Sequence, residues 1–299
     1  MITEKEHELV MFFNKYKIVS SKEIKYLFES SQYYRVQLEN MLRKKLIRKK
    51  DNYYLIATNG INQVKTLGYE YKRMSTTKDF IERLKIISSI ATLFYLNKNV
   101  EYISSIDIKD KNKITITSRR YIGILRINHI DYLTYYISKD HIDKYISSIF
   151  FDIQKEKKHR HIIILTEDIT RIPIADYKFG LYEILIVPYT VENQTLLGNM
   201  PIIDWQKILD SLYPNEKVII SKYNFIDYVT DNDNYINVFT FVDSEKIDSC
   251  KRFMLENKNK QLHIVCNKEI KDIIKQEIPK ASYTAIDLNN YIKEQTHYD

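Results

Sequence analysis

Four polar side chains gather within six residues of one another: Gln32, Tyr33, Arg35 and Gln37. An arginine guanidinium can bond O6 and N7 of a guanine, and a glutamine amide can bond N6 and N7 of an adenine. Such groups read a DNA sequence when they project from the first turns of a helix that lies in the major groove. The pattern therefore predicts base contacts from these four residues.

A second group of polar residues, nearly all cationic, follows directly along the chain. Its members are Arg43, Lys44, Lys45, Arg48, Lys49, Lys50 and Asn52. Cations that bind DNA phosphates add affinity but carry no sequence information. We expect this group to grip the backbone of a duplex, with Lys49, Lys50 and Asn52 at the tip of a hairpin.

The excess positive charge of the protein lies in the first quarter of the chain. Residues 1–75 hold 15 Lys and Arg against 8 Asp and Glu, and the remaining residues hold 31 of each kind. The first segment therefore accounts for the whole net charge of +7. A localised basic excess is the electrostatic footprint expected of a module that binds phosphates.

Three helices are predicted to position the base-reading group. The first spans residues 4–16, and the second runs to about Glu29 after Ser20 and Glu23, which have the spacing of a capping box. The third spans residues 32–45 and carries apolar side chains at roughly helical spacing, namely Val36, Leu38, Met41, Leu42 and Leu46. Two helices, a tight break and a third helix with a polar leading edge are typical of a helix-turn-helix.

A hairpin and a fourth helix complete this segment. Residues 47–56 are predicted to form two strands joined by a turn at Asp51 and Asn52. Thr58 is expected to cap a helix that ends at Leu67 and is closed by Gly68. The sequence therefore predicts a winged helix-turn-helix over residues 1–75, and the hairpin would be its wing.

Residues 31–69 carry a family resemblance. The stretches SQYYRVQLENMLRKKLIRKK from Ser31 and YLIATNGINQVKTLGY from Tyr54 resemble the replication-relaxation proteins of Gram-positive plasmids and conjugative elements. They are similar, more loosely, to MarR-type winged-helix repressors, although Ile56-Ala57-Thr58-Asn59-Gly60 departs slightly from the usual start of the last helix. The resemblance implies a role in plasmid replication, transfer or transcriptional control.

The same resemblance implies a second domain related to PD-(D/E)xK nucleases. Asp131 matches the first metal ligand of such a site and Lys139 the lysine, but Ile137 stands where an acidic ligand is needed. A nuclease-like scaffold without catalysis is one interpretation, and an unrelated α/β domain is the other.

Other catalytic patterns are weak. His159-Arg160-His161 resembles the paired histidines with which relaxases hold a metal, but Arg160 replaces an apolar residue there. With five glycines, the chain has neither a Walker loop nor a dinucleotide fingerprint. We therefore expect no catalytic residue, no metal ligand and no cofactor, although a metal-dependent relaxase or nuclease acting at an origin remains an alternative.

The rest of the chain is predicted to be mixed α and β. A helix at residues 76–98 links the winged module to the rest and is a candidate for dimerisation, or for packing on the C-terminal region. An α/β domain over 99–195 and an α/β subdomain over 196–299 follow, because strands and helices alternate there. The expected fold class is thus α+β, and Cys250 and Cys266 are expected to stay thiols.

The predicted partners are double-stranded DNA and a second copy of the chain, with replication or transfer proteins bound through the C-terminal region. A winged helix used for protein contacts alone is the alternative. No apolar run reaches the length of a membrane helix, and the start of the chain is polar. These features predict a cytoplasmic protein without membrane contacts.

Overall fold

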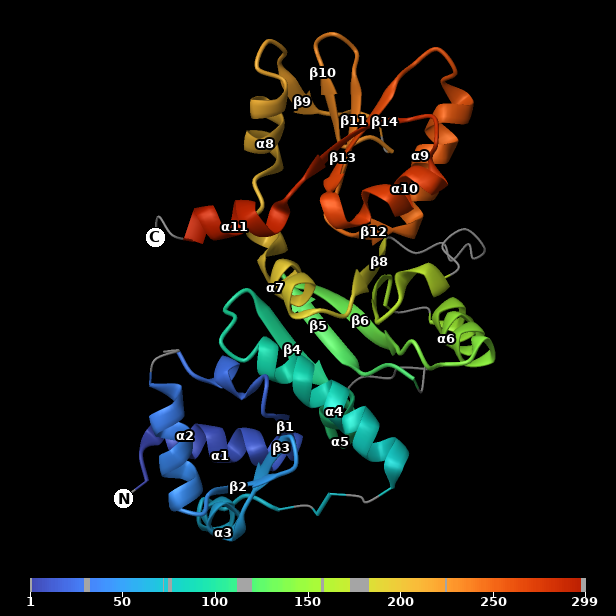
Figure 1. Cartoon of the computed structure of the whole chain (residues 1–299). Helices are drawn as coiled ribbons and strands as arrows, with labels where there is room; N and C mark the ends of the chain where they lie inside the picture. The colour runs from blue at the N-terminus through green and yellow to red at the C-terminus, as the bar shows by residue number, and fades with distance from the viewer. Residues whose placement is uncertain are drawn as a thin grey trace. The chain divides into compact units, whose positions relative to one another are not determined.

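The computed structural model describes residues 2–29, 33–71, 73–74, 77–111, 120–156, 159–172, 183–223 and 225–296 (Figure 1). The chain divides into two compact units. Unit 1 contains Met1–Lys113 with Ile122–Ile124, and unit 2 contains Ile114–Tyr121 with Leu125–Asp299. Both contain helices and strands, as the expected α+β class requires.

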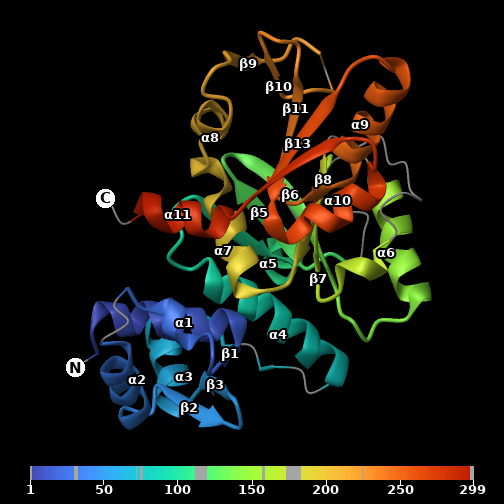
Figure 2. The same ribbon diagram turned by 45° about the horizontal axis from the view of Figure 1, so that its top comes forward.

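Unit 1 begins with helices gathered against a small antiparallel sheet (Figure 2). Its first elements are α1 (Glu4–Tyr16), β1 (Ile18–Ser20), the 3-10 turn η1 (Ile24–Leu27), α2 (Tyr34–Arg43), β2 (Ile47–Lys50), β3 (Tyr53–Ile56) and α3 (Thr58–Thr66). The strand order is β1-β3-β2. Leu9, Phe13, Leu27, Met41 and Val64 are fully buried between these elements, so one apolar core fixes their arrangement.

Specific residues cap the first and last helices of this segment, and of these the sequence predicted Gly68. The Thr3 hydroxyl accepts a hydrogen bond from the Glu6 backbone N–H, and the Glu6 carboxylate accepts one from the Thr3 N–H. This reciprocal pair caps the start of α1. Gly68, with a φ of 80°, follows the end of α3 in the left-handed region that favours glycine.

The capping box expected at Ser20 and Glu23 does not form. The Ser20 hydroxyl accepts from the Lys22 N–H, while the Glu23 carboxylate accepts from the Ser89 hydroxyl at 2.7 Å. Burial raises the pKa of Glu23. The Glu23 side chain that the capping box requires is bonded to Ser89 instead, and the expected second helix is reduced to η1.

Thr58 is the first residue of α3, and Ala57 occupies the cap position without a side-chain hydrogen bond. Backbone groups at the end of α2 hold the start of α3 instead. The Ala57 N–H donates to Leu46 O, and the Asn59 side chain donates to Lys44 O at 2.9 Å. The Thr58 cap prediction is therefore wrong, since the preceding loop supplies acceptors that order this turn.

The helix expected to link two domains is α4 (Lys78–Leu93), and it packs within unit 1. Its apolar stripe is buried at Leu84, Ile87 and Ala91, and the Ser88 hydroxyl donates to Ile18 O on β1. The stripe is therefore covered by the small sheet and η1. It is not presented for pairing with a second copy.

Two further elements close unit 1. They are β4 (Val100–Ser104) and α5 (Ser105–Lys111). Gly123 lies so close to Tyr102 and Ile103 that a Cβ atom there would meet the Ile103 carbonyl oxygen at 2.6 Å. Glycine is therefore required where the backbone at 122–124 meets β4.

Unit 2 starts with a parallel arrangement. Its elements to residue 202 are β5 (Gly123–Ile127, of which the first two residues belong to unit 1), β6 (Ile130–Ile137), α6 (Asp143–Lys155), β7 (His161–Thr166), η2 (Ile169–Arg171), β8 (Glu183–Pro188), α7 (Val191–Asn199) and η3 (Met200–Ile202). Strands β6, β7 and β8 are parallel neighbours, and Ile162–Leu165 at their centre are fully buried. Asn128 and His129, both with positive φ, make the tight turn before β6.

A second sheet follows in unit 2. Its region contains α8 (Trp205–Leu212), β9 (Val218–Ile220), β10 (Tyr228–Thr230), β11 (Tyr235–Phe239), β12 (Val242–Asp243), α9 (Ser244–Glu256), β13 (Leu262–Asn267), η4 (Lys268–Ile270), α10 (Lys271–Glu277), β14 (Ser282–Ile286) and α11 (Leu288–Thr296). The strand order is β14-β13-β11-β10-β9, with β11, β13 and β14 parallel.

Residues 125–299 form one compact unit where the sequence suggested separate regions over 99–195 and 196–299. Strand β12 pairs with β8 of the first sheet, and Asn193 donates to Glu269 at 2.9 Å. Both cysteines are free and buried, as expected. Among the described residues, no helix is long and apolar enough to cross a membrane.

Candidate nucleic-acid interface

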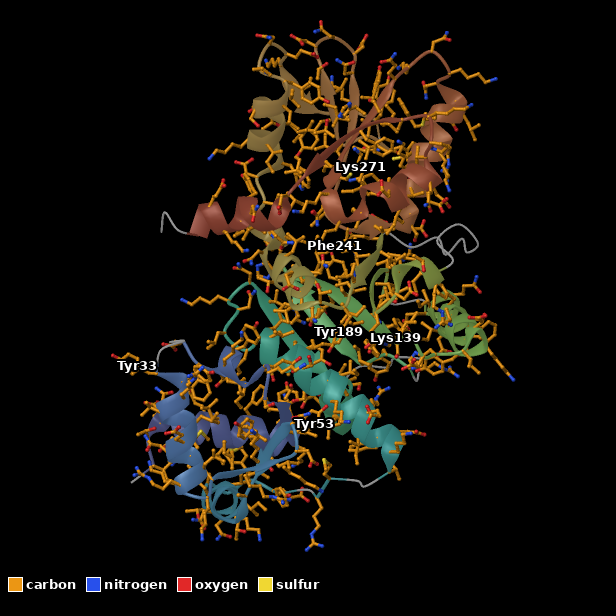
Figure 3. The ribbon with its side chains drawn as sticks, in the orientation of Figure 1. Tyr33, Tyr53, Lys139, Tyr189, Phe241 and Lys271 are labelled. Carbon is orange, nitrogen blue, oxygen red and sulfur yellow. The ribbon has the colours of Figure 1, made fainter. Side chains whose placement is uncertain are left out.

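Helix α2 turns its buried side chains to one side and its polar side chains to the other. Leu38 and Met41 are buried, while Tyr33, Arg35 and Gln37 are exposed. In Figure 3 the Tyr33 side chain extends away from the ribbon at the start of α2. Three of the four predicted base-reading residues therefore reach solvent from this helix, and Gln32 lies outside the described residues.

Val36 is exposed to 56%, although the sequence placed it among the core positions of this helix. Residues two positions apart on a helix point about 200° apart, so Val36 points away from the core that Leu38 enters. Asn40 and Arg43 follow at i+4 and i+7 and share its face. The centre of the outward face is thus Val36–Asn40–Arg43, which a helical projection centred on Leu38 and Met41 would have found.

Aromatic contacts support Arg35 on the edge of this face. Its Nε donates to the Tyr34 hydroxyl at 3.3 Å, and the guanidinium lies over the Tyr34 ring. That hydrogen bond raises the pKa of Arg35, which favours the cation. The Tyr34 ring packs against Phe28 in the break before α2. The core of unit 1 therefore supports an exposed arginine through one tyrosine.

The β2–β3 hairpin carries cations on a tight turn. Asp51 has a φ of 54°, and the Asn52 carbonyl accepts from the Ser21 N–H at 2.8 Å, which ties the turn to the loop before η1. Lys49, Lys50 and Asn52 are exposed. The tip thus presents two ammonium groups and one amide on an anchored turn.

The three cations at the end of α2 differ in their surroundings. Arg43 is exposed and donates to Asn40 Oδ1 at 2.8 Å, and Lys45 is exposed in a left-handed turn with a φ of 55°. Lys44 Nζ lies 2.8 Å from both carboxylate oxygens of Glu6. Burial acts to raise the pKa of Glu6, but the bonds from Lys44 and Thr3 lower it overall. Lys44 therefore serves to fasten α2 to α1.

The histidine pair considered for metal binding does not converge. His161 begins β7 with its Nδ1 3.4 Å from Glu183, whereas His159 precedes the strand with its Nδ1 3.3 Å from Glu156. Each imidazole is held by a different carboxylate. Among the residues that the structure describes, no three His, Cys, Asp or Glu side chains form a group that could hold a metal ion.

The nuclease comparison is corrected by the strand assignment. A PD-(D/E)xK site needs Asp131 and Lys139 on successive strands, but Asp131 lies at the start of β6 and Lys139 two residues after its end. The six residue steps of strand from Asp131 to Ile137 alone span about 20 Å, and the Arg126 guanidinium holds Asp131 at 2.7 Å. These two residues cannot share one metal ion.

Compared with protein-family models, with curated proteins and with solved structures, the chain matches none of them. The resemblance to replication-relaxation proteins thus depends on residues 31–69 alone.

Proposed function

We propose that unit 1 is a winged helix-turn-helix module that binds a specific site in double-stranded DNA. In this proposal α2 is the recognition helix and the β2–β3 hairpin is the wing. The observation that carries the proposal is the outward face of α2, which is exposed, polar at its edges and part of the same unit as a basic hairpin tip.

The proposed base contacts come from both edges and the centre of that face. Arg35 and Gln37 lie on either side of Val36 and offer hydrogen bonds to guanine and adenine. Val36 is suited to the methyl group of a thymine, which favours apolar contact. Tyr33 and Gln32 would extend the contacts at the start of the helix.

The proposed phosphate contacts are Arg43, Lys45, Arg48, Lys49 and Lys50, with Asn52 beside them. Lys44 is left out because Glu6 already neutralises its charge. Charge-assisted bonds from these groups would give affinity that weakens as salt rises. Following the family resemblance, we place the activity in the replication, transfer or transcriptional control of a plasmid or other mobile element, with unit 2 available for partner proteins.

Duplex binding measured against salt concentration tests the proposal. The probe is DNA from the region of the protein's own gene, with a random duplex as competitor. We expect Arg35→Ala to reduce the preference for the specific duplex by about tenfold, since a good base contact contributes about 1–3 kcal/mol. The double change Lys49→Ala/Lys50→Ala should weaken both duplexes alike and reduce the salt slope by about 2.

A matched control removes the same charge elsewhere. Lys217 and Lys222 are exposed in unit 2, so Lys217→Ala/Lys222→Ala changes the net charge equally and should leave the salt slope unchanged. If the two double variants weaken binding equally, the attraction is a general charge effect. If the wild-type protein binds no duplex even at low salt, unit 1 is a protein-interaction module.

A further inference from the structure

A hollow of about 500 Å³ lies in unit 1 behind the hairpin. Strands β2 and β3 contribute Arg48 and Leu55 to its wall, α3 contributes Lys65, and the segment after α3 contributes Tyr71 and Arg73. Lys65, Tyr71 and Arg73 are not among the proposed DNA contacts. The hollow is therefore lined both by the proposed wing and by residues that have no part in the proposed DNA contacts.

Its charge is entirely positive. Four cationic side chains, those of Lys17, Arg48, Lys65 and Arg73, line it, and no carboxylate does. Among the described residues, Arg48, Lys65 and Arg73 have no ion-pair or hydrogen-bond partner for their side chains. Like charges that converge on one hollow repel one another, and an anion placed between them removes that cost.

The remaining wall is apolar and aromatic. Leu55, Ile61 and Met74 line it together with the ring of Tyr71. Lys17 Nζ lies 4.7 Å from the Tyr71 ring centroid and 3.2 Å from Asn14 Oδ1, so this ring is held in place from one side. A flat apolar group can pack on such a surface while an attached anion reaches the cations.

We propose that this hollow binds a nucleoside phosphate. Three unpaired cations suit a phosphate group of charge −2 or more, and the guanidinium groups of Arg48 and Arg73 can each bond it in two places. The apolar wall and Tyr71 suit the face of a nucleobase. A volume near 500 Å³ lies within the range of pockets that enclose small ligands.

Binding there has a consequence that rests on the proposed function. Arg48 belongs both to this hollow and to the proposed phosphate contacts of the wing. When a nucleotide is bound to Arg48, this side chain is no longer available to contact a DNA phosphate. Nucleotide and duplex should therefore weaken each other's binding by the same factor.

Calorimetric titration of the full chain tests the proposal. The probes are ATP, ADP and AMP, with adenosine and inorganic pyrophosphate as partial ligands. We expect the nucleotides to bind and both partial ligands to bind about tenfold or more weakly. Lys65→Ala/Arg73→Ala should weaken nucleotide binding by about tenfold or more, and Lys217→Ala/Lys222→Ala, with the same change of net charge, should not.

Tyr71→Leu separates the two halves of the site. It should weaken ATP binding by several-fold and leave pyrophosphate binding unchanged, since only the base packs on the ring. The proposal is overturned if no nucleotide binds at millimolar concentration, or if Lys65→Ala/Arg73→Ala has no effect. It is also overturned if pyrophosphate binds as tightly as ATP.

A short single-stranded oligonucleotide provides the last arm, because a nucleotide unit can also belong to a strand. If the oligonucleotide binds more tightly than ATP and depends on Lys65 and Arg73, the hollow serves a strand, and the assignment to a free nucleotide is wrong. If the protein binds nucleotides but no duplex, the proposed function is wrong and the proposed nucleotide site is still supported.

Discussion

Units 1 and 2 use their charged residues differently. In unit 2 cations face carboxylates, as in the pairs Arg126–Asp131, Arg171–Asp143, Lys246–Asp227, Lys251–Glu277 and Lys268–Asp287. In unit 1 some cations are also paired, among them Lys44 with Glu6. The cations of the hairpin, together with Lys65 and Arg73 of the hollow, have no carboxylate partner among the described residues.

The difference separates charge that stabilises a fold from charge that is available to a ligand. A cation bonded to a carboxylate contributes little to the field that an approaching anion meets. The net charge of residues 1–75 therefore understates how unequal the two units are. On this comparison, removing a charge from unit 2 should reduce stability, and removing one from the hairpin should reduce only binding.

The largest expected effect is that of Asp227→Ala in unit 2. The Asp227 carboxylate lies 2.5 Å from Lys246 Nζ and accepts from the Val238 N–H at 2.8 Å. Its loss leaves a half-buried ammonium without its counter-ion, so the free energy of unfolding should fall by about 3 kcal/mol. Denaturant unfolding measures it. Asp272→Ala, an exposed carboxylate on α10, is the control and should cost less than about 0.5 kcal/mol.

A smaller effect is expected from the pH dependence of unit 2. Asp243 is 8% exposed, and burial together with the nearby charge of Glu183 raises its pKa to about 7. The folded protein then binds a proton that the unfolded chain releases near pH 4. The stability contributed by this proton is present below that value and is lost as the pH rises to about 7.

Asp243→Asn removes this titration and keeps the cap on α9, where the carboxylate accepts from the Glu245 and Lys246 N–H groups. Between about pH 5 and pH 7 the unfolding free energy of the wild type should fall relative to the variant by about 2 kcal/mol. Denaturant unfolding at several pH values measures the difference. Parallel curves for the two proteins would show that Asp243 titrates normally in the fold.

The smallest change in the free energy of unfolding is expected for the hairpin lysines of unit 1. Lys49→Ala/Lys50→Ala removes two exposed cations without carboxylate partners, so the free energy of unfolding should change by less than about 0.5 kcal/mol. Thermal and denaturant unfolding of the same samples used for duplex binding check this. A loss above about 1 kcal/mol would mean that the hairpin lysines stabilise the fold, and the contrast between the units would disappear.

Much of the secondary structure could be predicted from the sequence because it depends on local patterns. The apolar spacing of residues 4–16 predicts α1. The β-branched runs at residues 161–166, 183–188 and 261–266 predict strands that agree with β7, β8 and β13 within one residue at each end. Elements without a strong period were missed, among them α7, β10, β12 and α11. Strand β12 has two residues and exists because it pairs with β8, which no local pattern encodes.

The sequence by itself determined the charge of the first segment, the hairpin with its lysines and the α+β alternation, because composition and periodicity are properties of neighbouring residues. Only the tertiary structure decided which groups are available. In the folded chain Glu6 pairs with Lys44, and Glu23 accepts a hydrogen bond from Ser89. The Val36 side chain is exposed. Arg48, Lys65 and Arg73 line one hollow. Partners distant in the sequence compete for each side chain, and the packing of the whole unit selects among them.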